Sequence, residues 1–305
     1  SMFFNNWSSQ KKAAWLFLAP SLILYTIYVI LPITQTFYLS FTEWDGMRSV
    51  PLPLCFVDEE LSCFENYIEI LDDDVFITSF KNNLLWLCFF SLSPFMGLFM
   101  ALFFHVKGPL ASLYKSMIFT PMVFSLVVVG MVWGWFFQPE LGLLEFALHK
   151  TGLMEADQHV TLMSSFTWAT AGVIIAASWP HAAYCMILFL AGMSQIKKNV
   201  IEAAEIDGAS KIAMLWHIIL PSLRGATIVV VIVTMIGALR TFELISVMTA
   251  GGPANSSNVL ANYMYQQTFQ GFRYGYGSAI AVVLFCISLV LILSYLHITQ
   301  KSQEA

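Results

Sequence analysis

The sequence predicts an all-α polytopic membrane protein with six transmembrane helices, on the evidence of its composition and its apolar runs. Only 11% of the 305 residues are Asp, Glu, Lys or Arg, against about 25% in an ordinary soluble domain. The apolar share is 58%, and the mean hydropathy is +0.73. Several uncharged runs reach the length of about 20 residues that a helix needs to cross the hydrocarbon core. Because so few charges cannot cover a soluble surface, this composition excludes a soluble enzyme.

The first three predicted spans lie in the first half of the chain. No residue from Ala13 to Thr42 carries a formal charge, and the first span lies within this stretch. The run is far longer than the apolar core of a cleaved signal peptide, about 7–15 residues, so we expect a retained helix. An outer loop over 43–80 follows, and the second and third spans cover residues 82–106 and 116–138.

The second half supplies three more spans, one within residues 160–196, one over 225–250 and one within 274–300. Arg240 and Glu243 interrupt the fifth span. A continuous helix would place both side chains on one face, where they can pair. A charge inside the membrane is costly and usually faces the bundle interior or a watery cavity. The two residues are therefore either part of a polar path lining or an ion pair that holds the fifth span to a neighbour.

Basic residues indicate the orientation, because Lys and Arg near a span are retained on the cytoplasmic side. If residues 1–12 are cytoplasmic, the basic residues that fall inside are Lys11, Lys12, Lys107, Lys115, Lys197, Lys198, Lys211, Arg224 and Lys301. Those that fall outside are Arg48, Lys81, Lys150 and Arg273. We therefore expect both termini in the cytoplasm, with residues 13–305 as one six-span domain. Cys55 and Cys63 then lie in the oxidising outer loop, where a disulfide and two free thiols are both open.

The segment 197–224, between the fourth and fifth spans, differs from the other short connections. Good helix formers run from Val200 to Ile206, and Gly208 lies where a helix would stop. A second helical stretch is predicted over 210–220, closed by Pro221. We expect a helix–turn–helix at the cytoplasmic membrane surface, with small alanines that allow another backbone to approach closely.

This segment resembles the EAA loop of permease subunits from binding-protein-dependent ABC importers, of the form E-A-A-x-x-x-G followed by I-x-L-P. Here it reads Glu202-Ala203-Ala204, Gly208 and Ile218-Ile219-Leu220-Pro221. A plain amphipathic connecting helix is the alternative interpretation. Further motifs resemble the carbohydrate-uptake branch, in particular its maltose-F-like permease: Leu18-Ala19-Pro20-Ser21, Trp44 after Ser40-Phe41-Thr42, Phe189-Leu190-Ala191-Gly192, Phe242-Glu243-Leu244-Ile245 and Thr249-Ala250-Gly251-Gly252-Pro253. Lys197, Glu243 and Ala250 depart from that branch's usual Pro, Asp and Gly, which weakens inference about the substrate.

The resemblance implies a permease subunit that is not itself an enzyme and forms half of the path for a sugar or oligosaccharide. Its implied partners are a second related permease, two cytoplasmic ATPases that bind ATP and Mg²⁺, and an extracytoplasmic substrate-binding protein. No G-x-x-x-x-G-K-[ST] phosphate loop occurs in these residues. We expect the cytoplasmic (inner) membrane of a prokaryote, surrounding lipid, no cofactor of the chain's own and no nucleic acid. The residues implied to contact the ATPase are Glu202, Ala203, Ala204, Asp207 and Gly208.

Candidate residues for the path combine aromatic rings with hydrogen-bonding groups, because sugars present apolar C–H faces and hydroxyl edges. They are Trp179, His181, Tyr184, Arg240, Glu243, Asn262 and Gln266. A packed aromatic core around a neutral His181 is the alternative. Gly251, Gly252 and Pro253 are the candidate docking turn for the binding protein. No metal-ligand cluster or nucleophilic triad is evident.

Three rival functions stay open at this point. An importer for a polyol phosphate or a compatible solute is the first, and a phosphate would favour more cations along the path. A self-contained secondary carrier would need coupling carboxylates in its spans, where only Glu243 stands, close to Arg240. A membrane-embedded enzyme would need a polar catalytic cluster near one interface, and none stands out.

Overall fold

The computed structural model describes residues 2–47, 64–104, 111–155 and 157–304, and every regular element in these ranges is helical. Within these residues, four helices are long and apolar enough to cross a membrane, and the number rises to six if each of two bent helix pairs is one span. The all-α polytopic prediction is confirmed, with six as the upper bound of the candidate spans. The chain forms two compact units, Ser1–Asp72 with Met264–Val283, and Asp73–Tyr263 with Leu284–Ala305.

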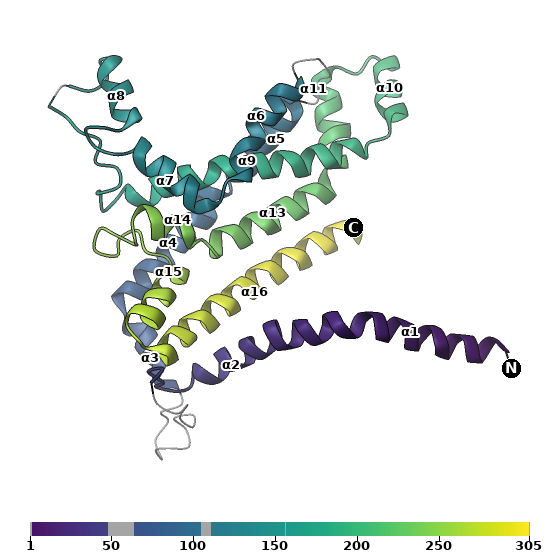
Figure 1. The fold of residues 1–305 in the computed structure, drawn as a ribbon. Helices are drawn as coiled ribbons and strands as arrows, with labels where there is room; N and C mark the ends of the chain where they lie inside the picture. The colour runs from purple at the N-terminus through teal and green to yellow at the C-terminus, as the bar shows by residue number, and fades with distance from the viewer. Residues whose placement is uncertain (1, 48–63, 105–110, 156, 305) are drawn as a thin grey trace. The chain divides into compact units, whose positions relative to one another are not determined.

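The first unit begins with a long run of helix, the purple segment of Figure 1. It is built from α1 (Met2–Tyr25), the π-helical turn η1 (Thr26–Ile30) and α2 (Leu31–Leu39). Residues Ala14–Leu39 form a candidate span, and none of the residues in its apolar window is buried within the chain. Such a helix needs lipid or another protein to cover its apolar side chains.

The segment after α2 is held by α3 (Glu65–Asp72) and by the start of α16 (Tyr274–Glu304). The buried Asn66 amide donates to the carbonyls of Ser40 and Thr42, each at 2.9 Å. The carbonyl of Trp44 accepts from the Gly275 amide at 3.1 Å, and its ring packs on Tyr274 with centroids 5.2 Å apart. A Cβ at position 275 would collide with the Thr42 carbonyl, so only glycine permits this close approach.

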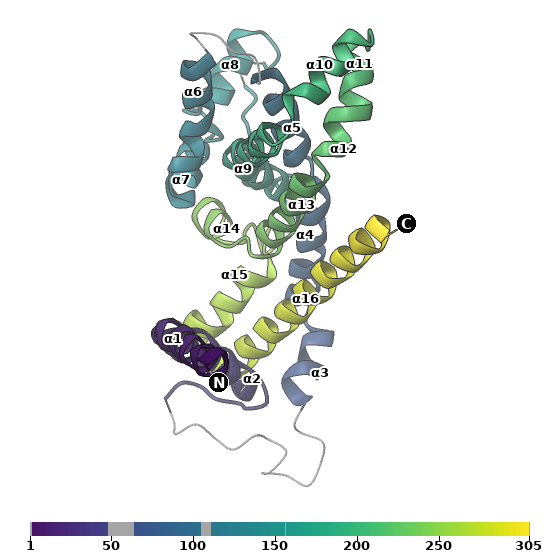
Figure 2. The same ribbon diagram turned by 90° about the vertical axis from the view of Figure 1, so that its right-hand side faces the viewer.

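The second unit is built around α9 (Ala169–Ser194), which packs against α4 (Asp74–Phe90), α5 (Ser93–Phe104), α7 (Leu126–Phe136) and α13 (Arg224–Leu239). Figure 2 shows α9 between α7 and α13. A Cβ on Gly97 of α5 would lie 2.8 Å from the Ala182 carbonyl, so the small residues bring these two backbones together. The unit's other elements are α6 (Ala111–Val123), α8 (Leu143–Lys150), α10 (Lys198–Ile206), α11 (Lys211–Met214), η4 (Leu215–Ile219), α12 (Leu220–Ser222) and α14 (Glu243–Met248). α15 (Leu260–Tyr265) and η5 (Gln266–Gln270) lead from this unit back into the first.

Breaks within the spans are the main departures from the predicted elements. The second span begins at Asp74 rather than at residue 82. The third is α6 followed by α7 at an angle of 100°, and the Ser125 side chain accepts from the Val128 amide at the break. Pro221 does not close a helix, because it lies in the first turn of α12, where a proline needs no amide hydrogen. The predicted fifth span is not continuous and divides into α13 and α14.

Candidate translocation site

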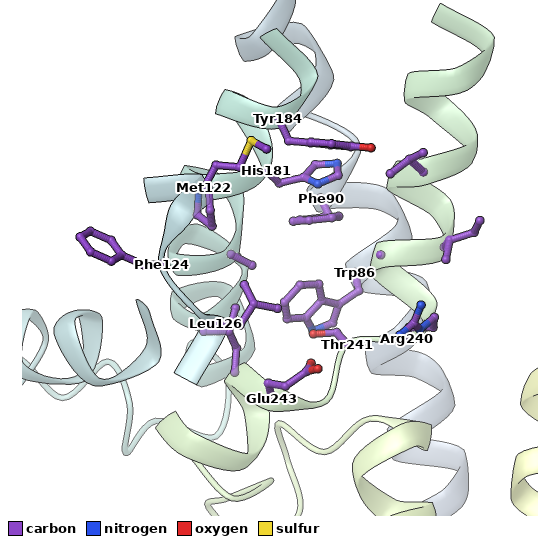
Figure 3. Close-up of a pocket in the computed structure, with 16 residues that line it drawn as sticks. Trp86, Phe90, Met122, Phe124, Leu126, His181, Tyr184, Arg240, Thr241 and Glu243 are labelled. Atoms are coloured by element: carbon purple, nitrogen blue, oxygen red, sulfur yellow. The ribbon is translucent and has the colours of Figure 1, made fainter. Parts of the chain in front are cut away.

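Four of the predicted path residues line one cavity of about 400 Å³ in the second unit: His181, Tyr184, Arg240 and Glu243. Figure 3 shows His181, Tyr184 and Phe90 toward one end, Thr241, Arg240 and Glu243 toward the other, and Trp86 between them. Trp86, Phe90 and Thr241 are not among the predicted residues. Two features of the sequence could have indicated them: the four-residue spacing of the two aromatics, and the position of Thr241 between the two charged residues.

The charged wall of this cavity is made where the helix is interrupted. α13 ends at Leu239, the Arg240 amide still donates to the Ile236 carbonyl at 2.9 Å, and α14 starts at Glu243. The expectation that one helix face carries both charged side chains is therefore wrong, because residues 240–242 are not helical. Among the ion pairs of the described residues there is none between Arg240 and Glu243. Both side chains are exposed in the isolated chain.

His181 has a defined hydrogen-bonding state if its ring is neutral. Its Nε2 lies 2.8 Å from the hydroxyl oxygen of Thr234, and that hydroxyl donates to the Val230 carbonyl at 2.7 Å. Because the single hydroxyl hydrogen is used there, Thr234 can only accept from His181, so Nε2 carries the hydrogen. Nδ1 is then an acceptor. The ring also stacks on Phe90, with centroids 4.4 Å apart.

The remaining predicted path residues lie elsewhere. Trp179 lines a separate, apolar cavity of about 750 Å³ and packs edge-on against Trp133. Asn262 is only 2% exposed and donates to the Asn258 side chain at 2.7 Å. Gln266 opens η5 in the other unit. None of the three lines the cavity of His181.

The Gly251-Gly252-Pro253 turn is held from inside by hydrogen bonds. Gly251 has φ +86°, and a Cβ there would lie 2.9 Å from the Asn258 side chain, so glycine is required. The Ser257 hydroxyl bonds to Thr249 and to the Gly252 carbonyl, and the Gly252–Pro253 bond is cis. Gly251 is buried and the next two residues are half-buried. The turn therefore offers a docking partner only part of its surface.

The EAA residues lie on an exposed helix with a defined end. The prediction that α10 stops near Gly208 is confirmed, because Gly208 has φ +76° and two hydrogen bonds complete a Schellman motif. The Gly208 amide donates to Glu205 at 3.1 Å and the Ala209 amide donates to Ala204 at 2.9 Å. Ile206 is 86% exposed. The EAA motif gave no indication of this exposed apolar side chain. Of the predicted contact residues, Ala204 is half-buried, and the exposed ones are Glu202, Ala203, Asp207 and Gly208.

Two groups of predicted residues need separate mention. Cys55 and Cys63 lie outside the described residues. No group of three or more His, Cys, Asp or Glu side chains suited to a metal ion occurs in the part of the chain that the structure describes.

Known proteins resemble this chain over nearly its whole length. The sulfoquinovosyl glycerol transport permease SmoG of Agrobacterium fabrum is 32% identical over 95% of this chain and 91% of its own. The sn-glycerol-3-phosphate transport permease UgpA of the same organism is 28% identical over 92% of each chain. A crystal structure of a bacterial alginate ABC transporter, in complex with an alginate pentasaccharide-bound periplasmic protein, matches the fold with a TM-score of 0.81. It covers 96% of both chains at 20% identity.

Residues 93–303 match the family described as "Binding-protein-dependent transport system inner membrane component". This match covers more than half of the chain, and the relatives agree with it. The chain belongs to this family of ABC transporter permeases.

Proposed function

We propose that this chain is the permease subunit of an ATP-driven importer and forms half of the translocation path for a sugar or oligosaccharide. The observation that carries the proposal is the cavity of His181. Its volume of about 400 Å³ lies in the range of about 300–1,000 Å³ that is usual for ligand pockets. Aromatic rings and hydrogen-bonding groups share its wall.

The chemistry of this wall suits a polyhydroxyl solute. The rings of Phe90 and Tyr184 can lie against apolar C–H faces of a sugar. Nδ1 of His181 and the carboxylate of Glu243 can accept hydrogen bonds from hydroxyls, while Arg240 can donate to hydroxyl or ring oxygens. The name of SmoG, which specifies a sulfoquinovosyl glycerol, supports a glycosidic substrate.

The chain needs partners to perform this transport. ATPase subunits, which would bind ATP and Mg²⁺, dock on the end of α10 and on its C-terminal cap, at Glu202, Ala203, Ala204, Asp207 and Gly208. An apolar side chain as exposed as Ile206 supports a protein contact there. A second permease completes the path, and a binding protein delivers the solute at the opposite face. The periplasmic protein of the alginate transporter structure supports this last partner. Both termini and the α10 loop are cytoplasmic in this arrangement.

An importer for a polyol phosphate is the second candidate. Arg240 is the one Lys or Arg side chain among the described residues that line the cavity, and guanidinium groups bind phosphate well. The name of UgpA, which specifies sn-glycerol 3-phosphate, favours the same candidate.

The test is reconstitution of this chain with its second permease, ATPase and binding protein, followed by ATPase assays with a panel of solutes. Neutral sugars and oligosaccharides should stimulate hydrolysis, and Tyr184→Ala should reduce the stimulation. If only sn-glycerol 3-phosphate stimulates, the second candidate replaces the first. If the chain purifies without an ATPase or a second permease and transports down an ion gradient, it is a secondary carrier instead.

A further inference from the structure

Two adjacent asparagines of α4 are buried in the second unit and have their side-chain amides bonded to backbone. Asn82 is 6% exposed and Asn83 is 1% exposed. The Asn82 amide donates to the carbonyls of Ser256 at 2.7 Å and Asn258 at 2.8 Å. Asn82 therefore holds the loop before α15, and neither of these bonds reaches a residue that lines the cavity.

Asn83 is bonded in two directions. Its Oδ1 accepts from the Leu260 amide at 2.9 Å, and its Nδ2 donates to the Ala238 carbonyl at 3.4 Å. Since an amide hydrogen must face an acceptor, the bond to Leu260 fixes the orientation of the side chain and turns the NH₂ group toward Ala238. Asn83 thus connects the first residue of α15 with the end of α13.

The Ala238 carbonyl lies at the end of α13, just before the segment that carries the charged residues of the cavity wall. It is one of the last four carbonyls of α13, which have no donor within their own helix. Ala238 is fully buried, so water is not a ready substitute. Arg240 and Glu243 follow within five residues, on either side of the non-helical residues 241 and 242.

We propose that Asn83 is a positioning residue, which holds the end of α13 so that residues 240–243 keep the conformation that places Arg240 and Glu243 in the cavity wall. The role of this wall as a lining of the solute path rests on the proposed function, whereas the positioning of residues 240–243 does not. The same bond pair gives the first residue of α15 a direct mechanical connection to the cavity wall, so a displacement of the start of α15 is transmitted to Arg240.

The test is hydrogen–deuterium exchange of the assembled importer in nanodiscs, with matched variants of the two neighbours. In Asn83→Ala, the amides of residues 240–243 should exchange about fivefold faster or more, the effect of losing one buried hydrogen bond. In Asn82→Ala, faster exchange should be confined to residues 256–259. Asn83→Asp separates the two directions, because it keeps the acceptor for Leu260 and replaces the donor to Ala238. It should loosen residues 240–243 while Leu260 stays protected.

A functional measurement accompanies the exchange data. ATPase stimulation by the solute-loaded binding protein should fall more in Asn83→Asp than in Asn82→Asp. Unchanged exchange at 240–243 in both Asn83 variants, or equal loosening in Asn82→Ala, would overturn the proposal. If Asn83→Ala does not assemble, Asn83→Asp carries the same comparison. The exchange result does not depend on which solute is carried, so failure of the proposed function is seen separately, in the ATPase panel.

Discussion

Gly208 shows how the backbone conformation of one residue can determine where a helix ends. Its φ of +76° completes the cap of α10, and a Cβ placed there meets no atom of the described residues within 4 Å. The position therefore requires a left-handed conformation but has free space around it. Asn tolerates this conformation, whereas a β-branched residue does not.

We predict from this that Gly208→Val uncouples ATP hydrolysis from transport and Gly208→Asn does not. Valine would pay roughly 1–2 kcal/mol or more to adopt this conformation, so the cap would open and the loop would change its path. ATPase and uptake rates of the reconstituted importer measure the coupling. Normal uptake by the valine variant would remove Gly208 from the contact with the ATPase. Equal uncoupling by asparagine would show that side-chain volume, not φ, is what matters.

His181 offers a second test on one side chain. In His181→Phe the ring against Phe90 is kept and the Nδ1 acceptor is removed, while Thr234 keeps its bond to Val230. We expect solute-stimulated ATPase activity to fall about tenfold, the cost of one unmet hydroxyl in a polar site, with assembly unchanged. His181→Asn, which restores an acceptor, should recover part of the loss. Full activity in the phenylalanine variant would assign His181 to packing alone.

The connection between α7 and α9 depends on a buried carboxylate. Glu145 of α8 is 3% exposed. It accepts from His159 at 2.8 Å and from the Val160 amide at 2.9 Å. The hydrogen bond from His159, followed by that from Val160, lowers the pKa of Glu145 to about 2. The same bond raises the pKa of His159 above its ordinary value of 6.5. Neighbouring titratable groups are His149, whose Nε2 is 3.5 Å from the carboxylate, and Glu140 and Asp157, which also raise the pKa of His159.

These shifts predict the pH at which this connection is most stable. The hydrogen bond that raises the pKa of His159 contributes its full stabilisation below pH 6.5. This stabilisation is lost as the pH rises through the raised pKa that His159 has in the folded protein. The lowered pKa of Glu145 stabilises it above 4.5, and this is lost as the pH falls toward about 2. The protection factors of the amides of residues 157–160, which compare each exchange rate with the intrinsic rate at the same pH, should therefore be highest between pH 4.5 and 6.5 and lower above the raised pKa of His159. His159→Gln should abolish the alkaline change, and an unaltered pH profile in that variant would contradict the assignment.

The sequence predicts those elements whose ends are set by local residues. The end of α10 follows from the glycine at position 208, where φ is positive, and the apolar runs predict where most spans lie. The break between α13 and α14 could not be read in this way. No proline or glycine marks residues 240–242. The Ala238 carbonyl, which has no helical donor at the break, accepts a hydrogen bond from Asn83, 155 positions earlier in the chain.

The candidate site could also be predicted only in part from the sequence. His181, Tyr184, Arg240 and Glu243 were accessible to sequence reasoning, but their grouping with Trp86 and Phe90 depends on the packing of α4 against α9.

The molecule as a whole leaves apolar surface that its own chain does not cover. The apolar window of the first candidate span is entirely unburied, and the α10 segment presents Ile206 at 86% exposure. Lipid can cover the first. The second lies beside charged residues on a short helix that is not one of the candidate spans, so a protein partner is the better cover. These two surfaces support the proposed assembly of the chain with lipid and a partner protein.

The contact at Ile206 can be tested by charge. Burying an isoleucine at an interface contributes about 1.5–3 kcal/mol, so Ile206→Glu should weaken ATPase binding by about tenfold or more. Co-purification of the ATPase with the tagged permease measures this, at matched membrane expression. Leu153→Glu is the control, because Leu153 is 78% exposed but lies after α8, far along the chain from the EAA motif. Its ATPase should co-purify as with the wild type. If both variants lose the ATPase equally, general instability is the cause. If Ile206→Glu retains it, the ATPase binds to a different surface.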